Sequence, residues 1–118
     1  MKISKVAEIL DAEIVACHNF SDHDVSSACG SDMMSDVLAF VKDQAVLLTG
    51  LVNSQVIRTA EMMDMRCIVF VRSKQPSPEM LALAEECGIV VMTSKKRMYE
   101  ACGLLYSRGL NNLSVREA

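Results

Sequence analysis

Ala45-Val46-Leu47-Leu48-Thr49 is the first of three short apolar stretches that decide the fold of this chain. The second is Cys67-Ile68-Val69-Phe70-Val71, and the third is Ile89-Val90-Val91-Met92. Runs this short that are apolar on both faces are typical of strands buried in a parallel sheet. Each run precedes a segment with helical periodicity, and these segments lie at 54–63, 78–87 and 95–106. The alternation predicts a single α/β domain with a mostly parallel sheet flanked by helices.

The first half of the chain carries weaker signals of the same kind. A helix is predicted over residues 3–10, with Ser4 as its cap. Short strands are predicted at 14–17 and 25–29, on either side of a polar turn. Ser31-Asp32 is predicted to open the next helix. The apolar stripe of that helix consists of Met33, Met34, Val37, Leu38 and Val41.

Residues at the predicted helix ends support these boundaries. Ser77-Pro78-Glu79 places a capping hydroxyl before a first-turn proline and an acidic residue. Gly88 and Gly109 follow predicted helix ends, where a left-handed residue is common. We therefore expect a domain over residues 1–110 and a flexible tail over 111–118.

Composition excludes several classes of protein. With 118 residues, of which 51% are hydrophobic and 23% charged, the chain has the balance of one globular domain. A net charge of -3 and a pI near 5.3 give no basic patch for DNA or RNA. The apolar runs fall short of the roughly 20 residues that a membrane helix needs. The N-terminus lacks the apolar core of a signal peptide. These features predict a cytoplasmic protein that binds neither membranes nor nucleic acid.

The five cysteines are odd in number and scattered, which indicates reduced thiols in the core rather than a disulfide framework. Cys17, His18, His23 and Cys29 lie close in sequence, but their spacing matches no zinc motif. No G-x-S-x-G motif is present either. We expect no metal, no cofactor and no catalytic site.

The best candidate site lies where the three predicted parallel strands end. The carboxyl ends of such strands and the starts of the following helices meet at one edge of the sheet, where anionic ligands tend to bind. Arg72 adds a forked charge that matches a phosphate. A simpler interpretation stays open, in which Asn53, Ser77 and Ser94 only cap helices and Arg72 is a solvated strand end. The residues gathered at this edge are Thr49, Gly50, Asn53, Arg72, Ser73, Lys74, Thr93, Ser94 and Lys95.

Two other features have a structural and a functional interpretation. Asp32 and Asp36 are four residues apart and could serve as ligands on one helix face, but capping and compensation of the helix dipole explain them as well. The segment 98–106 is apolar around much of its helical circumference. Burial by the sheet on one side and by a second copy on the other would cover it, which predicts a homodimer.

A resemblance to a known family rests on the segments 3–10, 31–38 and Leu48-Thr49-Gly50-Leu51-Val52-Asn53, and on the order of the three βα units. In these features the chain resembles a stand-alone DRTGG domain, similar to the N-terminal domain of bacterial HPr kinase/phosphorylase. The motif that names the family falls on Asp22-His23-Asp24-Val25-Ser26-Ser27-Ala28. Here His23 replaces the arginine, and Ser27 and Ala28 replace the two glycines.

The resemblance implies a regulatory, ligand-binding or oligomerising module. In that family the domain accompanies an HPr kinase domain, a phosphotransacetylase, or nucleotide-regulated CBS domains of an inorganic pyrophosphatase. The HPr kinase activity belongs to a separate domain with a P-loop, and this chain has no G-x-x-x-x-G-K-[ST] sequence.

Two hypotheses follow for the function. The first is a non-catalytic regulatory module that binds a phosphorylated or nucleotide-like ligand at the edge formed by Thr49, Arg72 and Thr93, and that self-associates. The alternative is a docking or assembly protein that joins a larger partner enzyme and takes no small ligand. An enzyme would require a pocket with a convergent acid and base, which the sequence does not indicate.

Overall fold

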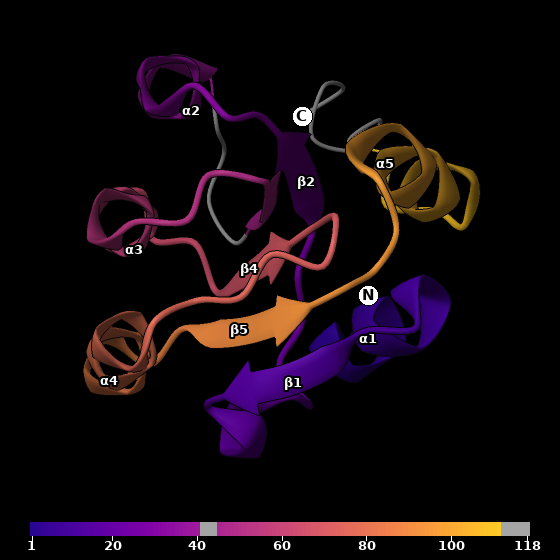
Figure 1. Ribbon diagram of the computed structural model, residues 1–118. Coiled ribbons are helices and arrows are strands. Elements are labelled where there is room, and N and C mark those ends of the chain that lie inside the picture. The colour runs from indigo at the N-terminus through magenta and orange to yellow at the C-terminus, as the bar shows by residue number, and fades with distance from the viewer. Residues whose placement is uncertain (41–44, 112–118) are drawn as a thin grey trace.

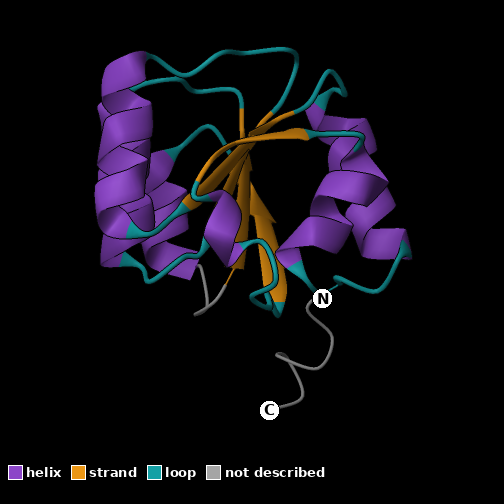
Figure 2. Ribbon diagram, turned by 90° about the horizontal axis from the view of Figure 1, so that it is seen from below, coloured by secondary structure: helices purple, strands orange, loops and turns teal. Residues whose placement is uncertain are grey.

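The computed structural model describes residues 1–40 and 45–111, and shows an open sheet with helices on both faces (Figure 1; Figure 2). This confirms the predicted α/β class. The helices in the described residues are α1 (Ile3–Leu10), η1 (His18–Phe20), α2 (Met34–Phe40), α3 (Ser54–Met62), α4 (Pro78–Cys87) and α5 (Met98–Ser107). The strands are β1 (Glu13–Ala16), β2 (Ser27–Gly30), β3 (Ala45–Thr49), β4 (Cys67–Phe70) and β5 (Val90–Thr93).

The five strands form one sheet in the order β1-β5-β4-β3-β2. Strands β2 to β5 pair in parallel, which confirms the mostly parallel sheet. Strand β1 pairs antiparallel with β5, and its register shifts between Ile14 and Ala16. Short helical connections join the parallel strands, as βαβ units require.

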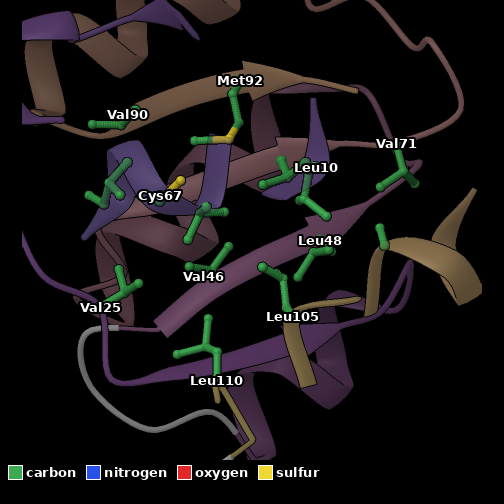
Figure 3. Packing of buried hydrophobic residues seen from close by; sticks show 14 of the residues in the cluster. Leu10, Val25, Val46, Leu48, Cys67, Val71, Val90, Met92, Leu105 and Leu110 are labelled. Atoms are coloured by element: carbon green, nitrogen blue, oxygen red, sulfur yellow. The ribbon is translucent and has the colours of Figure 1, made fainter. Parts of the chain in front are cut away.

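Two hydrophobic clusters lie on opposite faces of the sheet. Val46 and Leu48 of β3 pack with α1 and α5, where Leu105 is also buried (Figure 3). Leu47, between them in sequence, packs on the other face with residues of α3 and α4. Side chains alternate between the faces of a strand, so a strand covered on both sides must be apolar throughout. This explains the continuous apolar runs.

Several predicted boundaries are confirmed because local hydrogen bonds fix them. The side chain of Asn53 accepts a hydrogen bond from the Val56 N–H at 3.2 Å and caps α3. Ser77 caps α4 in the same way, accepting from the Met80 N–H at 3.2 Å. Gly88 ends α4 in the left-handed conformation, with φ of 69°.

Other predicted boundaries in the first half were wrong. Lys2, whose side chain makes no capping bond, occupies the N-cap of α1, and Ser4 lies inside the helix. Ser31-Asp32 does not open α2, which begins at Met34, because the Asp32 carboxylate bonds to the loop after β3 instead. The strand predicted at 25–29 corresponds to β2, which begins two residues later, at Ser27, and ends one residue later, at Gly30.

The start of the last helix was also predicted too early. Helix α5 begins at Met98 behind the N-cap Arg97, and no side chain caps it. Ser94 is not its cap, because the Ser94 hydroxyl accepts from the Lys96 N–H at 3.2 Å, ahead of the helix, and donates to the carbonyl of Leu10 at 2.9 Å. Val41 and residues 112–118 of the predicted tail lie outside the described residues. None of the helices in the described part of the chain is long and apolar enough to cross a membrane.

Candidate functional site

The connections that follow β4 and β5 leave the sheet toward opposite faces. Helix α4 packs with α3 on one face, whereas α5 packs with α1 on the other (Figure 1). Adjacent parallel strands whose connections diverge in this way leave a crevice at their carboxyl ends, which is the usual ligand position in open α/β sheets. A hollow of about 450 Å³ lies there, lined by Arg72, Ser73, Lys95 and Arg97. We call it the carboxyl-end hollow.

The loop after β4 has an unusual backbone. Arg72 and Ser73 both have φ of 59°, in the left-handed region. This conformation costs a non-glycine residue roughly 1–2 kcal/mol. Two hydrogen bonds hold it: the Arg72 N–H donates to the Lys96 carbonyl at 2.8 Å, and the Ser73 N–H donates to the Ser94 carbonyl at 2.9 Å. The two loops that line the hollow are therefore tied directly to each other.

A second group of polar residues fixes the neighbouring loop after β3. Oδ1 of Asp32 accepts hydrogen bonds from the Thr49 hydroxyl at 2.9 Å and from the Gly50 N–H at 2.7 Å. The bond from Gly50 is the main reason why the pKa of Asp32 lies below its ordinary value, and Thr49 and Arg72 lower it further against the effect of burial. Asp32 thus carries a stable negative charge beside the Arg72 guanidinium.

The carboxyl-end hollow is positively charged. Arg72, Lys95 and Arg97 contribute three cations, and all three residues are exposed. Ion pairs within residues 1–40 and 45–111 lie elsewhere and join Lys2 to Asp24, Lys5 to Glu8, and Arg58 to Glu61. The three cations of the hollow take part in none of these ion pairs, and Arg72 is attracted to Asp32 without forming one with it.

The structure brings together only part of the predicted site. Arg72, Ser73 and Lys95 line the hollow, and Gly50 lies under the Arg72 guanidinium. The hydroxyl of Thr49 is taken by Asp32, and Asn53 is occupied as a helix cap. Thr93 and Ser94 are buried and do not line the hollow.

Two residues of this region were missed or misassigned by sequence reasoning. Arg97 lines the hollow, and the run Lys95-Lys96-Arg97 directly after a strand was the signal that could have identified it. Asp32 was interpreted either as a ligand on a helix face or as a cap, but its carboxylate joins the loops after β2 and β3. The partners of Asp32, Thr49 and Gly50, lie 17 and 18 residues away, so a local sequence pattern cannot predict these bonds.

Metal binding finds no support in the described residues. Nowhere in residues 1–40 and 45–111 do three His, Cys, Asp or Glu side chains gather where they could hold a metal ion. All five cysteines carry free thiols.

An open α/β sheet with a cationic crevice at its carboxyl ends defines the class of domain. The chain belongs to the DRTGG domain family, which matches residues 5–107, and this confirms the predicted resemblance to that family. A comparison with curated proteins found no match.

Among solved structures, the chain is similar to the CBS and DRTGG domains of the regulatory region of Clostridium perfringens pyrophosphatase, complexed with its activator diadenosine tetraphosphate. The TM-score is 0.73 at 15% sequence identity, and the match covers 88% of this chain. It covers 45% of the other chain, so this protein spans less than half of that regulatory region. The likeness establishes the shared fold.

The segment 22–28, on which the family motif falls, lies at the opposite end of the sheet, where β2 begins. His23 from this segment lines a second hollow of about 250 Å³, together with Phe20, Asp64, Arg66 and Gly88. The rings of Phe20 and His23 lie 5.0 Å apart in a tilted arrangement. The motif segment and the carboxyl-end hollow are therefore separate features of the domain.

Proposed function

We propose that this chain is a regulatory binding domain that takes a phosphorylated or nucleotide-like anion in the carboxyl-end hollow. The observation that carries the proposal is the meeting of Arg72, Lys95 and Arg97 at a crevice between diverging connections. Guanidinium groups bind phosphate oxygens through paired N–H donors, and a crevice of this type is where α/β sheets place such ligands. The nucleotide activator of the pyrophosphatase regulatory region supports the ligand class.

The size and walls of the hollow fit a small polar ligand. Its volume of about 450 Å³ lies within the roughly 300–1,000 Å³ typical of small-molecule sites. All four lining residues are polar, so they recognise the charged part of a ligand rather than an apolar body.

We assign the hollow a binding role rather than a catalytic one. The lining side chains supply three cations and the Ser73 hydroxyl, without a carboxylate or imidazole to act as a general base.

Free thiols at all five cysteines support a cytoplasmic setting for this domain.

The experiment is a thermal-shift and calorimetric titration of the full chain with pyrophosphate, AMP, ATP and diadenosine tetraphosphate. A ligand at 100 times its dissociation constant stabilises the folded state by about 2.7 kcal/mol. This raises the melting temperature of a domain of this size by several degrees. We expect Arg72→Ala to reduce that rise to about half or less. Arg58→Ala, on the exposed side of α3, is the matched control and should leave the rise unchanged. A flat response to all four ligands would refute the proposal.

Self-association is a second proposed property, and exposed aromatic side chains on α5 favour it. Tyr99 and Tyr106 are 93% and 56% exposed. A second copy of the chain, or a partner enzyme in the alternative docking function, would cover them. Sedimentation velocity should show a dimer that dissociates in Tyr99→Ser/Tyr106→Ser. Met62→Ser, on α3, is the control for a loss of exposed apolar surface elsewhere. A monomer that is recovered only bound to a larger enzyme would favour docking.

A further inference from the structure

The guanidinium of Arg72 lies over Gly50, in the space that a side chain would need. A Cβ atom at position 50 would collide with Nη2 of Arg72 and would lie 3.2 Å from its Cζ and Nε atoms. The φ angle of Gly50 is outside the left-handed region, so its backbone does not require glycine. Glycine is needed at this position because the Arg72 guanidinium occupies the space of a Cβ atom.

Asp32 holds the same loop from another direction. Its carboxylate bonds to the Gly50 N–H and to the Thr49 hydroxyl, which fixes the position of Gly50. The negative charge of Asp32 also interacts favourably with Arg72. The guanidinium thereby fills the vacant side-chain position at Gly50 and is attracted to the carboxylate of Asp32.

We infer that Gly50 is a positioning residue for anion binding, because its vacant side-chain position seats the Arg72 guanidinium at the rim of the carboxyl-end hollow. This inference rests on the proposed function, because it assigns to Gly50 the orientation of Arg72, the main cation of the carboxyl-end hollow. A guanidinium that is already oriented loses less side-chain entropy when it binds an oxyanion, and it presents its parallel N–H donors as a pair.

The decisive variant is Gly50→Ala. The added Cβ meets the far end of a flexible side chain, so the guanidinium moves and the fold keeps its stability. Pyrophosphate binding is measured by calorimetry on the full chain. Loss of a charge-assisted contact in Arg72→Ala should weaken binding by about 10- to 100-fold. We expect Gly50→Ala to weaken it by about 3- to 10-fold, a part of that loss. In the Arg72→Ala background, Gly50→Ala should have no further effect.

Two further measurements separate orientation from charge and from folding. The Nε–H resonance of Arg72, identified by its absence in Arg72→Ala, should shift in ligand-free Gly50→Ala. Arg72→Lys keeps the charge but cannot lay a planar group over Gly50, so its affinity should be reduced. Wild-type affinity in Arg72→Lys would overturn the inference even if Gly50→Ala failed to fold.

The control glycine is Gly103 on α5, where an added Cβ meets nothing within 4 Å. Gly103→Ala should bind pyrophosphate like the wild type. If Arg72→Ala also binds like the wild type, the proposed function itself fails. If Arg72→Ala weakens binding but Gly50→Ala does not, the positioning role of Gly50 is refuted and the anion site stands. The same conclusion follows if Gly50→Ala weakens binding by the same factor in the Arg72→Ala background as in the wild type.

Discussion

The backbone N–H of Cys17 donates a hydrogen bond to a carboxylate oxygen of Glu85 at 2.8 Å, which ties the end of β1 to helix α4. The second carboxylate oxygen lies 3.5 Å from the Cys17 sulfur. Cys17 has φ of 56°, and it is 1% exposed. The bond therefore satisfies a buried donor at a strained turn, where the chain leaves the sheet for η1.

Loss of this carboxylate should destabilise the domain. Glu85→Ala leaves the Cys17 N–H without its partner, and we expect a loss of about 1–2 kcal/mol in the free energy of unfolding. Urea denaturation followed by circular dichroism measures the change. Glu86→Ala, the next residue of the same helix, is the control and should change stability by less than about 0.5 kcal/mol. Equal effects of the two substitutions would contradict the role of Glu85.

The thiol of Cys87 should react slowly at neutral pH, and Glu61 contributes to this. Burial and the Glu61 carboxylate, 3.0 Å from the sulfur, together raise the pKa of Cys87 to about 11, the carboxylate by hydrogen bonding and charge. Since the thiolate is the reactive form, alkylation should accelerate as the pH rises toward that value. Glu61→Gln should lower the pKa and speed the alkylation of Cys87 severalfold.

Peptide mass spectrometry after iodoacetamide treatment gives the labelling rate of each cysteine separately. Cys102 is the internal control, because burial alone raises its pKa. An unchanged rate at Cys87 in Glu61→Gln would show that the carboxylate does not act on the thiol.

Relief of backbone strain at Ser73 should stabilise the protein. Glycine adopts φ of 59° without the steric cost that serine bears, although it loses more chain entropy on folding. We expect Ser73→Gly to raise the free energy of unfolding by about 0.5–1 kcal/mol. Lys74→Gly, one residue later and outside the left-handed region, should lower it instead. Stabilisation in both variants, or in neither, would argue against strain at this turn.

The contribution of Asp32 to stability should depend on pH. Hydrogen bonds from Gly50 and Thr49, together with Arg72, lower the folded-state pKa of Asp32. A lowered folded-state pKa stabilises the protein above the unfolded value, about 3.9, and this stabilisation is lost as the pH falls through the folded-state pKa. Asp32→Asn should therefore be less stable than the wild type at pH 7, with a difference that shrinks in acid.

Urea titrations at pH 7 and in the acid range measure this difference. Asp36→Asn is the control, because the bonds from Thr49 and Gly50 go to Asp32 and not to Asp36. A difference between Asp32→Asn and the wild type that stays constant down to acid pH would rule out the charge of Asp32 as its source.

Local patterns predicted the second half of the fold well. Strand β3 and helix α4 have the predicted ends, because a continuous apolar run defines the first, and Ser77 and Gly88 cap the second. The antiparallel pairing of β1 with β5 was not predicted, since it depends on a partner far away in the sequence.

The candidate site was predicted in outline. The edge of the sheet and Arg72 follow from the strand ends, which are local features. The roles of Asp32 and Gly50 depend on contacts between loops that follow different strands, and the role of Ser94 depends on a bond to the last residue of α1. Such contacts leave no periodic signal, so Ser94 was interpreted as a candidate ligand or a helix cap, and Asp32 as a ligand on a helix face or a cap.

The pairing of the first strand with the last parallel strand has a consequence for biosynthesis. A chain that leaves the ribosome from its N-terminus can assemble β2, β3 and β4 in order, because each finds its neighbour in the next βα unit. Strand β1 has to wait until β5 has emerged before it gains its backbone partner. Of these five strands, the first to be synthesised is thus among the last to be placed, and the nascent chain carries a β1 without its strand partner until translation has passed Thr93.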